Sequence, residues 1–264
     1  MNKSKLKKIY SNISLNEWEL KEIQELKNNN SSSFENIINK LDKIERNSNE
    51  LVYANIFHDT IKNSKWFNEP LSLTSWSIGY NMAYILYRCL NEIKPKKILE
   101  LGLGQSTKIT NAYASYYKDI HHDIVEHNKE WVAFFKNNTD MSHMVNFHLL
   151  DNCKKNYNGI EYNAYKNFKK EFDDKKFDLL LIDAPVGGTE YARMDILDIV
   201  PGCLEDSFII LLDDCNRIGE QNTIRLLQDK LTKNNIEFCC GYLNKGVTDV
   251  YICTSKDLEF LCSI

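Results

Sequence analysis

Apolar residues in the last two thirds of the chain gather in short runs, and a polar residue follows most of them. The runs lie near residues 97–101, 123–126, 146–150, 178–182, 207–212, 236–241 and 248–253. Their length and their apolar composition predict buried β-strands. Helical periodicity fills most of the intervening segments, near residues 106–117, 129–137, 189–198 and 219–232. Residues 78–91 are apolar almost all round and predict a buried helix.

The alternation of these strands and helices defines the predicted fold class. Spacing of this kind predicts βαβ units with right-handed crossovers, and therefore an α/β, doubly wound, Rossmann-like sheet of seven strands. The last two predicted strands are joined only by a short turn around Asn244, Lys245 and Gly246. We therefore expect the sheet to end in an antiparallel hairpin.

The first 69 residues show helical periodicity without strands. Their apolar positions form three groups: Leu15, Trp18, Leu20, Ile23 and Leu26; Phe34, Ile37, Ile38, Leu41 and Ile44; and the apolar positions of residues 51–61. The polar run 28–33 predicts a break, with Ser33 capping the next helix. We predict a helical N-terminal extension over residues 1–69 and a ligand-binding domain over residues 70–264. The extension is expected to act as a lid, to form a homodimer contact, or both.

Composition narrows the class of protein. The chain has 264 residues, 43% of them hydrophobic, and a net charge of −4, so it can bury a sizeable core and has no basic excess for nucleic acid. No apolar run has the length of a membrane helix or of a signal peptide core, which predicts a cytoplasmic protein without a membrane partner. Eight cysteines without a C-x-x-C pair predict buried thiols in a reducing compartment, and no zinc site.

The segment after the first predicted strand carries the strongest local signal. Gly102 and Gly104 follow the apolar residues Leu99 and Leu101, and a predicted helix begins behind them. Glycines permit a tight turn and a close approach of the backbone to a ligand, and a helix start presents free N–H groups. The residues of this segment expected to contact a ligand are Glu100, Gly102, Gly104, Gln105, Ser106 and Thr107.

Further residues help to identify the ligand. Thr107 stands where a dinucleotide-binding motif has a third small residue, and no phosphate-binding G-x-x-x-x-G-K-[ST] loop occurs. Glu126 follows Gly104 by 22 residues and ends the second predicted strand, where a carboxylate meets ribose hydroxyls. The other candidates at strand ends are His127, Asp151 and Asn152, of which the last two are placed to contact an adenine amino group.

The glycine pair, both acids and the strand order together resemble class I S-adenosylmethionine-dependent methyltransferases. This resemblance implies that S-adenosylmethionine is the cofactor and that the glycine turn, Glu126 and Asp183 help to bind it. Two other interpretations remain open. One is an NAD- or nucleotide-sugar-dependent enzyme on a similar sheet, and the other is a non-catalytic subunit that binds the cofactor.

Three acids end the fourth and fifth predicted strands, namely Asp183, Asp213 and Asp214. Neighbouring strand ends lie about 4.8 Å apart, so these carboxylates would repel one another unless a cation or protons intervened. Oxygen ligands suit Mg²⁺ or Mn²⁺. The pattern resembles metal-dependent O-methyltransferases such as catechol O-methyltransferase, which implies a metal site at these acids. That family has a lysine base where this chain has Val186, so the base role cannot be carried over. Without a catalytic metal, Asp183 is a candidate base or cofactor ligand.

A narrower resemblance comes from the stretch Asp183-Ala184-Pro185-Val186-Gly187 and the pair Arg193-Met194. Both resemble polysaccharide-biosynthesis methyltransferases, including glucuronoxylan O-methyltransferases. This implies methyl transfer to an oxygen of a small polar acceptor that contains a sugar or phosphate, in bacterial capsule or surface polysaccharide biosynthesis. O-methyl phosphoramidate decoration is one such product. Asp183 and Arg193 are the predicted catalytic residues, with Arg193 binding an anionic group of the acceptor.

Overall fold

The computed structural model describes residues 17–73, 77–244 and 246–263. The chain divides between Arg46 and Asn47 into two compact units, and the second contains the sheet. The predicted boundary lay after residue 69. Residues 47–69 nevertheless belong with the sheet, because Phe57, Trp66 and Phe67 are buried in its core.

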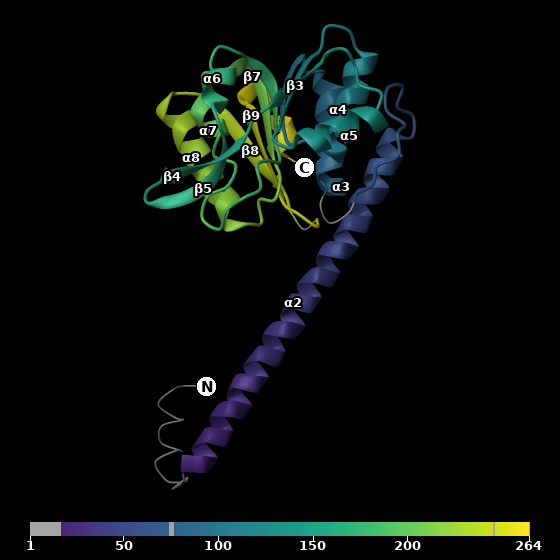
Figure 1. Cartoon of the computed structure of the whole chain (residues 1–264). Helices are drawn as coiled ribbons and strands as arrows, with labels where there is room; N and C mark the ends of the chain where they lie inside the picture. Colours follow the sequence, from purple (N-terminus) through teal and green to yellow (C-terminus); the bar gives the residue numbers. More distant parts are fainter. Residues whose placement is uncertain (1–16, 74–76, 245, 264) are drawn as a thin grey trace. The chain divides into compact units, whose positions relative to one another are not determined.

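One mixed sheet of seven strands forms the centre of the second unit (Figure 1). Its strands, in chain order, are β1 (Lys97–Leu101), β2 (His121–Glu126), β3 (Val145–Leu149), β6 (Phe177–Ile182), β7 (Leu204–Leu212), β8 (Phe238–Leu243) and β9 (Val250–Ser255). They lie in the order β3-β2-β1-β6-β7-β9-β8. The first five are parallel, whereas β9 runs antiparallel to both β7 and β8. The predicted fold class and final hairpin are confirmed.

Helices cover both faces of the sheet (Figure 1). One face carries α3 (Tyr80–Arg88), which continues into the π-helical turn η1 (Cys89–Ile93), together with α4 (Gln105–Tyr116) and α5 (Lys129–Asn138). The other face carries α6 (Phe168–Phe172), α7 (Ile196–Ile199) and α8 (Ile218–Lys233). A 3-10 segment, η2 (Lys256–Cys262), follows the last strand. None of the described helices combines the length and the apolarity that crossing a membrane requires.

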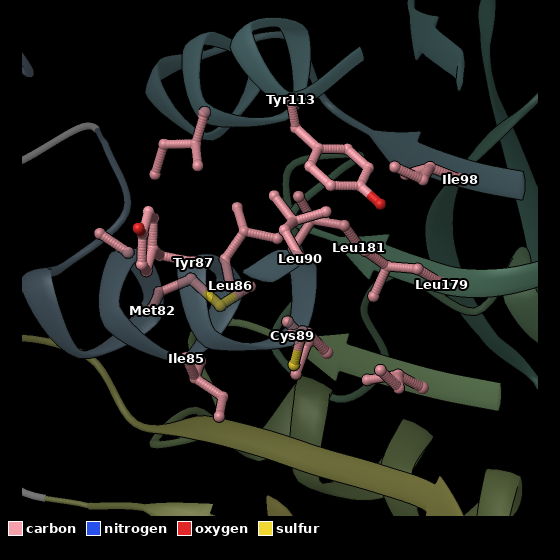
Figure 2. Packing of buried hydrophobic residues seen from close by; sticks show 14 of the residues in the cluster. Met82, Ile85, Leu86, Tyr87, Cys89, Leu90, Ile98, Tyr113, Leu179 and Leu181 are labelled. Atoms are coloured by element: carbon pink, nitrogen blue, oxygen red, sulfur yellow. The ribbon is translucent and has the colours of Figure 1, made fainter. Parts of the chain in front are cut away.

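The hydrophobic core forms two layers, one on each face of the sheet, because alternate residues of each strand point to opposite faces. Ile98, Leu179 and Leu181 pack with α3 and α4, as Figure 2 shows around Leu86 and Tyr113. The neighbouring strand residues, among them Leu99 and Leu180, belong to the cluster on the opposite face. Successive side chains of a strand point to opposite faces, so a strand covered on both sides must be apolar at every position. This explains why the continuous apolar runs predicted the strands correctly.

The N-terminal helix differs from the prediction. Helix α2 (Glu17–Ile61) is continuous, so the break expected at residues 28–33 and the cap at Ser33 are wrong. Asparagine and serine cost only about 0.5 kcal/mol each in a helix relative to alanine, and α2 contains neither glycine nor proline. Leu15 lies outside the described residues, as do the side chains of Trp18, Leu20, Ile23 and Leu26. The lid and the homodimer remain predictions.

A two-stranded sheet that was not predicted follows β3. It consists of β4 (Asn152–Tyr157) and β5 (Ile160–Tyr165), which pair antiparallel. The turn between them has positive φ at Asn158 (52°) and Gly159 (86°). Asn-Gly between two strands is a strong signal for a two-residue hairpin, because both residues tolerate this conformation. The sequence therefore contained the signal for this hairpin.

The helix predicted for residues 189–198 is largely absent. Only α7 (Ile196–Ile199) is helical there, and Arg193 has a φ of 57°. Its side chain is buried and donates a hydrogen bond of 2.6 Å to the carbonyl oxygen of Asp213 at the end of β7. A contact with a strand distant in the chain thus overrides the local helical preference of this segment.

Candidate functional site

The carboxyl ends of four strands meet at one edge of the sheet. The backbone N–H of Gly102 donates to Val125 (3.0 Å), that of Asp183 to Leu101 (3.0 Å), and that of Asp213 to Ile182 (3.1 Å). These bonds continue the parallel ladders of β1, β2, β6 and β7 by one residue. The glycine turn, Glu126, Asp183 and Asp213 are therefore brought to one rim. Ligands of open parallel sheets bind at this edge.

A first cavity opens at this rim, against the turn between β1 and α4. It is lined by Ser77, Ile78, Gly102, Leu103, Gly104, Gln105, Glu126, His127, Asp183, Ala184, Pro185 and Val186. Six of the predicted cofactor-binding residues are among them, namely Gly102, Gly104, Gln105, Glu126, His127 and Asp183. The structure thus brings together residues that are up to 81 positions apart in the sequence, counted from Gly102 to Asp183.

The two glycines of the turn serve different purposes. Gly102 has a φ of 102°, and a Cβ there would lie 3.0 Å from the Cβ of Ala184. Gly102 is therefore required by the backbone conformation and by close packing. A Cβ on Gly104, in contrast, would meet no atom within 4 Å. Because Gly104 lines the cavity, its missing side chain leaves room for a ligand.

Glu100 lies behind the turn rather than in the cavity. Its carboxylate is fully buried and accepts hydrogen bonds from the hydroxyls of Ser106 (2.6 Å), Thr107 (2.9 Å) and Thr110 (2.9 Å). His122 Nε2 lies 2.9 Å from the same carboxylate. Of these residues, Glu100, Ser106 and Thr107 were predicted to contact the cofactor. Their side chains instead fasten α4 to β1 and do not line the cavity, because the hydroxyls are needed to satisfy a buried charge.

Glu126 faces the cavity in an orientation set by the backbone. Its Oε1 accepts from the N–H groups of His127 and Asn128, both at 2.8 Å, and its Oε2 accepts from Leu103 at 3.3 Å. His127 Nδ1 also lies 2.9 Å from Oε1. The carboxylate is thus held at the end of β2, where it can accept hydrogen bonds from a diol.

The resemblance to S-adenosylmethionine-dependent methyltransferases implies that Glu126 binds the ribose of the cofactor, so replacing Glu126 with alanine is expected to weaken S-adenosylhomocysteine binding by about 1–3 kcal/mol, the range for hydrogen bonds to a charged group. Isothermal titration calorimetry measures this loss. Glu130→Ala is the matched control, since Glu130 is an exposed carboxylate in the first turn of α5 and lines neither cavity of the rim. Equal affinities of the wild type and a folded Glu126→Ala variant would contradict a role of Glu126 in cofactor binding.

The predicted adenine contacts lie elsewhere. Asp151 is exposed, and its carbonyl oxygen accepts a hydrogen bond from the N–H of Lys166 (2.8 Å). Asn152 begins β4 and pairs with Tyr165. Neither residue lines the cavity, because the chain turns at this point into the β4–β5 hairpin. The arrangement therefore gives no support to a contact of these two side chains with adenine.

A second cavity adjoins the first. It is lined by Ser77, Asp183, Val186, Arg193, Asp213, Asp214, Asn216, Arg217, Val247 and Thr248. Ser77, Asp183 and Val186 line both cavities. Asp183 therefore stands at the junction between the glycine turn on one side and a charged pocket on the other.

Arg193 is the centre of the charges around the second cavity. Its side chain is 3% exposed, and one terminal nitrogen lies 3.1 Å from Asp183 Oδ1 and also donates to Asp214 Oδ2. Its Nε lies 3.6 Å from Glu220 Oε1. Asp214 Oδ1 is also 2.9 Å from the half-exposed guanidinium of Arg217. The cluster thus joins the ends of β6 and β7 to the first turn of α8.

These contacts and the burial of the side chains shift the pKa values of the charged groups at the rim. Burial raises the pKa of Asp183 above its ordinary value, and the positive charge of Arg193 opposes this shift. Burial and the charge of Asp214 likewise raise the pKa of Asp213, whose Oδ1 accepts a hydrogen bond of 2.6 Å from Thr248. Burial disfavours the charge of Arg193, but Asp183 and Asp214 outweigh it and raise the pKa of that guanidinium. Arg193 is therefore cationic.

The acids at these strand ends do not fit a resident divalent ion. Within the described ranges, no group of three or more histidine, cysteine, aspartate or glutamate side chains is placed to hold a metal. The guanidinium of Arg193 lies against Asp183 and Asp214, and Asp213 Oδ1 is engaged by Thr248 and by the N–H of Asp214. The metal site expected at Asp183, Asp213 and Asp214 is therefore not formed. Arg193, from the connection between β6 and α7, supplies the positive charge.

Comparison with known proteins supports the fold. No protein-family model and no curated protein matches the sequence. The O-methyltransferase TomG from Streptomyces achromogenes, involved in tomaymycin synthesis and solved with S-adenosylmethionine, is 12% identical at a TM-score of 0.53. The match covers 80% of this chain and 96% of TomG. A Klebsiella pneumoniae protein, provisionally assigned as an O-methyltransferase, is 14% identical at a TM-score of 0.53. That match covers 78% of this chain and 98% of the other. The chain shares their fold.

Part of the rim was not predicted from the sequence. Ser77, Val247 and Thr248 line the second cavity from loops that precede α3 and that join β8 to β9. Arg217, directly before α8, also escaped notice. None of them belongs to a recognisable local pattern. Only the position of Arg217, three residues after Asp214, offered a signal, because it follows a predicted strand end.

Proposed function

We propose that the chain is an S-adenosylmethionine-dependent O-methyltransferase, with the cofactor in the first cavity and the acceptor in the second. The observation that carries this proposal is the junction of the two cavities at Asp183. Methyl transfer requires the donor carbon and the acceptor oxygen to face each other in line, which two adjoining cavities allow. The fold shared with a methyltransferase that was solved with S-adenosylmethionine supports the choice of cofactor.

Each element around the first cavity has a role in this proposal. The turn at Gly102 and Gly104 admits the cofactor close to the backbone, beside the N-terminus of α4. Glu126 accepts hydrogen bonds from the ribose hydroxyls, and Gln105 is fixed by a bond of 2.9 Å that its Oε1 accepts from the N–H of Ser72. When bound, S-adenosylmethionine supplies a methyl group activated by a positive sulfonium. The protein has mainly to align the reactants.

Asp183 is the proposed general base. When bound, S-adenosylmethionine would supply the methyl group and leave as S-adenosylhomocysteine, and the Asp183 carboxylate would accept the proton of the acceptor hydroxyl. Burial raises the pKa of Asp183 to about 8, so its carboxylate is a stronger base than an exposed one, and the carboxylate form increases as the pH rises through this value. Asp183 therefore takes the place of the lysine base that the resemblance to metal-dependent enzymes would imply, where this chain has Val186.

The charge of the second cavity favours an uncharged acceptor. The acids Asp183, Asp213 and Asp214 line it together with two arginines, Arg193 and Arg217. Arg193 is already paired with these acids, so the predicted role of binding an anionic acceptor group is not supported by its contacts. We therefore favour a sugar hydroxyl over an anionic phosphoramidate. The resemblance of residues 183–187 and 193–194 to polysaccharide-biosynthesis enzymes supports a role in surface polysaccharide assembly.

Two measurements test this function. Calorimetry of the full chain should detect S-adenosylhomocysteine binding but not NAD⁺ or a nucleotide sugar, and NAD⁺ binding would favour the dehydrogenase-like alternative. Transfer of a labelled methyl group from S-adenosylmethionine is then followed across neutral sugars, sugar phosphates and phosphoramidates by mass spectrometry. We expect methylation of a neutral sugar hydroxyl. Cofactor binding without transfer to any acceptor would favour a non-catalytic subunit.

A further inference from the structure

The Arg193 guanidinium occupies the point on which the acidic oxygens of the rim converge. Carboxylates of Asp183 and Asp214, from the ends of two neighbouring strands, meet one of its nitrogens. The other terminal nitrogen donates to the backbone oxygens of Asp213 (2.6 Å) and Ile182 (3.4 Å). Glu220, which is fully buried, lies 3.6 Å from the Nε. The group is therefore surrounded by oxygens on three sides.

The oxygen atoms around Arg193 are of the kinds that bind divalent cations. Magnesium and calcium ions in proteins are bound by carboxylate and carbonyl oxygens that converge on one point. Here carboxylate and carbonyl oxygens converge instead on the planar guanidinium of Arg193. Arginine keeps its charge at all ordinary pH values, and its several donors can serve carboxylate and carbonyl oxygens at once.

We propose that Arg193 is the built-in cation of this site, a positioning residue that holds Asp183 at the junction of the two cavities in place of a divalent metal. If the chain is a methyltransferase, as proposed above, one consequence is that methyl transfer needs no added metal. A second consequence concerns the acceptor. Because no metal has to be chelated by two adjacent oxygens of the acceptor, an acceptor with a single hydroxyl suffices.

The left-handed backbone of Arg193 supports this assignment. A φ of 57° is uncommon for a residue other than glycine and is retained only where surrounding contacts demand it. The contacts that demand it here are those of the guanidinium with the ends of β6 and β7. Arg225 offers a matched comparison, because its side chain lies on α8 and donates to Asn222 (3.2 Å), a neighbour in the same helix.

The first test measures the full chain without any acceptor. Manganese chloride should leave the melting temperature of the wild type and of Arg225→Ala unchanged. Arg193→Ala removes the cation from between the acids, so its melting temperature should be lower and should rise by about 3 °C with millimolar manganese or guanidinium chloride. A loss of packing alone would not be reversed by either cation. A variant that responds to neither, or a wild type stabilised by manganese, would overturn the proposal.

A second test covers the case in which Arg193→Ala does not fold. Arg193→Lys keeps the charge but loses the planar set of donors, so we expect a folded variant whose kcat falls at least about tenfold while S-adenosylhomocysteine affinity stays within about threefold. Treatment of the wild type with EDTA should not change its transfer rate to the acceptor found in the screen above. Recovery of activity only on addition of Mg²⁺ or Mn²⁺ would refute a built-in cation. Failure of the wild type to bind S-adenosylhomocysteine would instead refute the proposed function, and the melting experiment would still decide the role of Arg193.

Discussion

Gly104→Val is expected to weaken S-adenosylhomocysteine binding at least about 100-fold, which corresponds to about 2.7 kcal/mol. The new side chain would fill space in the first cavity, because a Cβ at Gly104 meets no protein atom within 4 Å. For the same reason its Cβ has nothing to clash with in the free protein. The φ of Gly104 is −163°, in the extended range rather than the left-handed one. The melting temperature should therefore change by only about 2 °C or less.

Gly102→Ala provides the contrast to this variant. Gly102 has a positive φ, and an added Cβ would lie 3.0 Å from that of Ala184. Alanine in a left-handed conformation costs about 1–2 kcal/mol, so the melting temperature should fall by about 2–8 °C. Calorimetry and thermal unfolding of both variants separate the two roles. If Gly104→Val binds S-adenosylhomocysteine as tightly as the wild type does, the first cavity is not the cofactor site.

Asp183→Asn is expected to reduce the rate of methyl transfer at saturating substrates about 10²–10⁴-fold, the usual contribution of a general base. Asparagine has nearly the same shape but cannot accept the proton of the acceptor hydroxyl. Asp183 lines both cavities, so the loss should appear in kcat, while affinity for S-adenosylhomocysteine should change much less. Single-turnover transfer and calorimetry measure the two quantities.

The control for this variant is Asp151→Asn. Asp151 also follows a strand end, but it is exposed and lines neither cavity of the rim, so its replacement should change neither quantity. The opposite pattern for Asp183→Asn, a large loss of cofactor affinity with an unchanged maximal rate, would assign Asp183 to the binding of the cofactor. If neither the rate nor the affinity changes in Asp183→Asn, Asp183 is neither the general base nor a cofactor ligand.

The strands and the first cavity could be predicted from the sequence because their signals are local. A strand covered on both faces must be apolar throughout, and the residue after it emerges at the rim. Gly102, Gly104, Glu126 and Asp183 were therefore expected at one rim, and they line one cavity. The β4–β5 hairpin, with its Asn158-Gly159 turn, was equally predictable and was missed.

The partners of the charged residues were decided only by the tertiary structure. The sequence showed Glu100 beside the glycine turn and three acids at two strand ends, but not which cation or hydroxyl would face them. The fold directs Glu100 to the hydroxyls of α4, and it brings Arg193 against Asp183 and Asp214. A buried charge must find its partner in space, and here a helix and a loop supply it. Motif spacing therefore determined where the first cavity lies, whereas tertiary packing determined which charged side chains meet at the second.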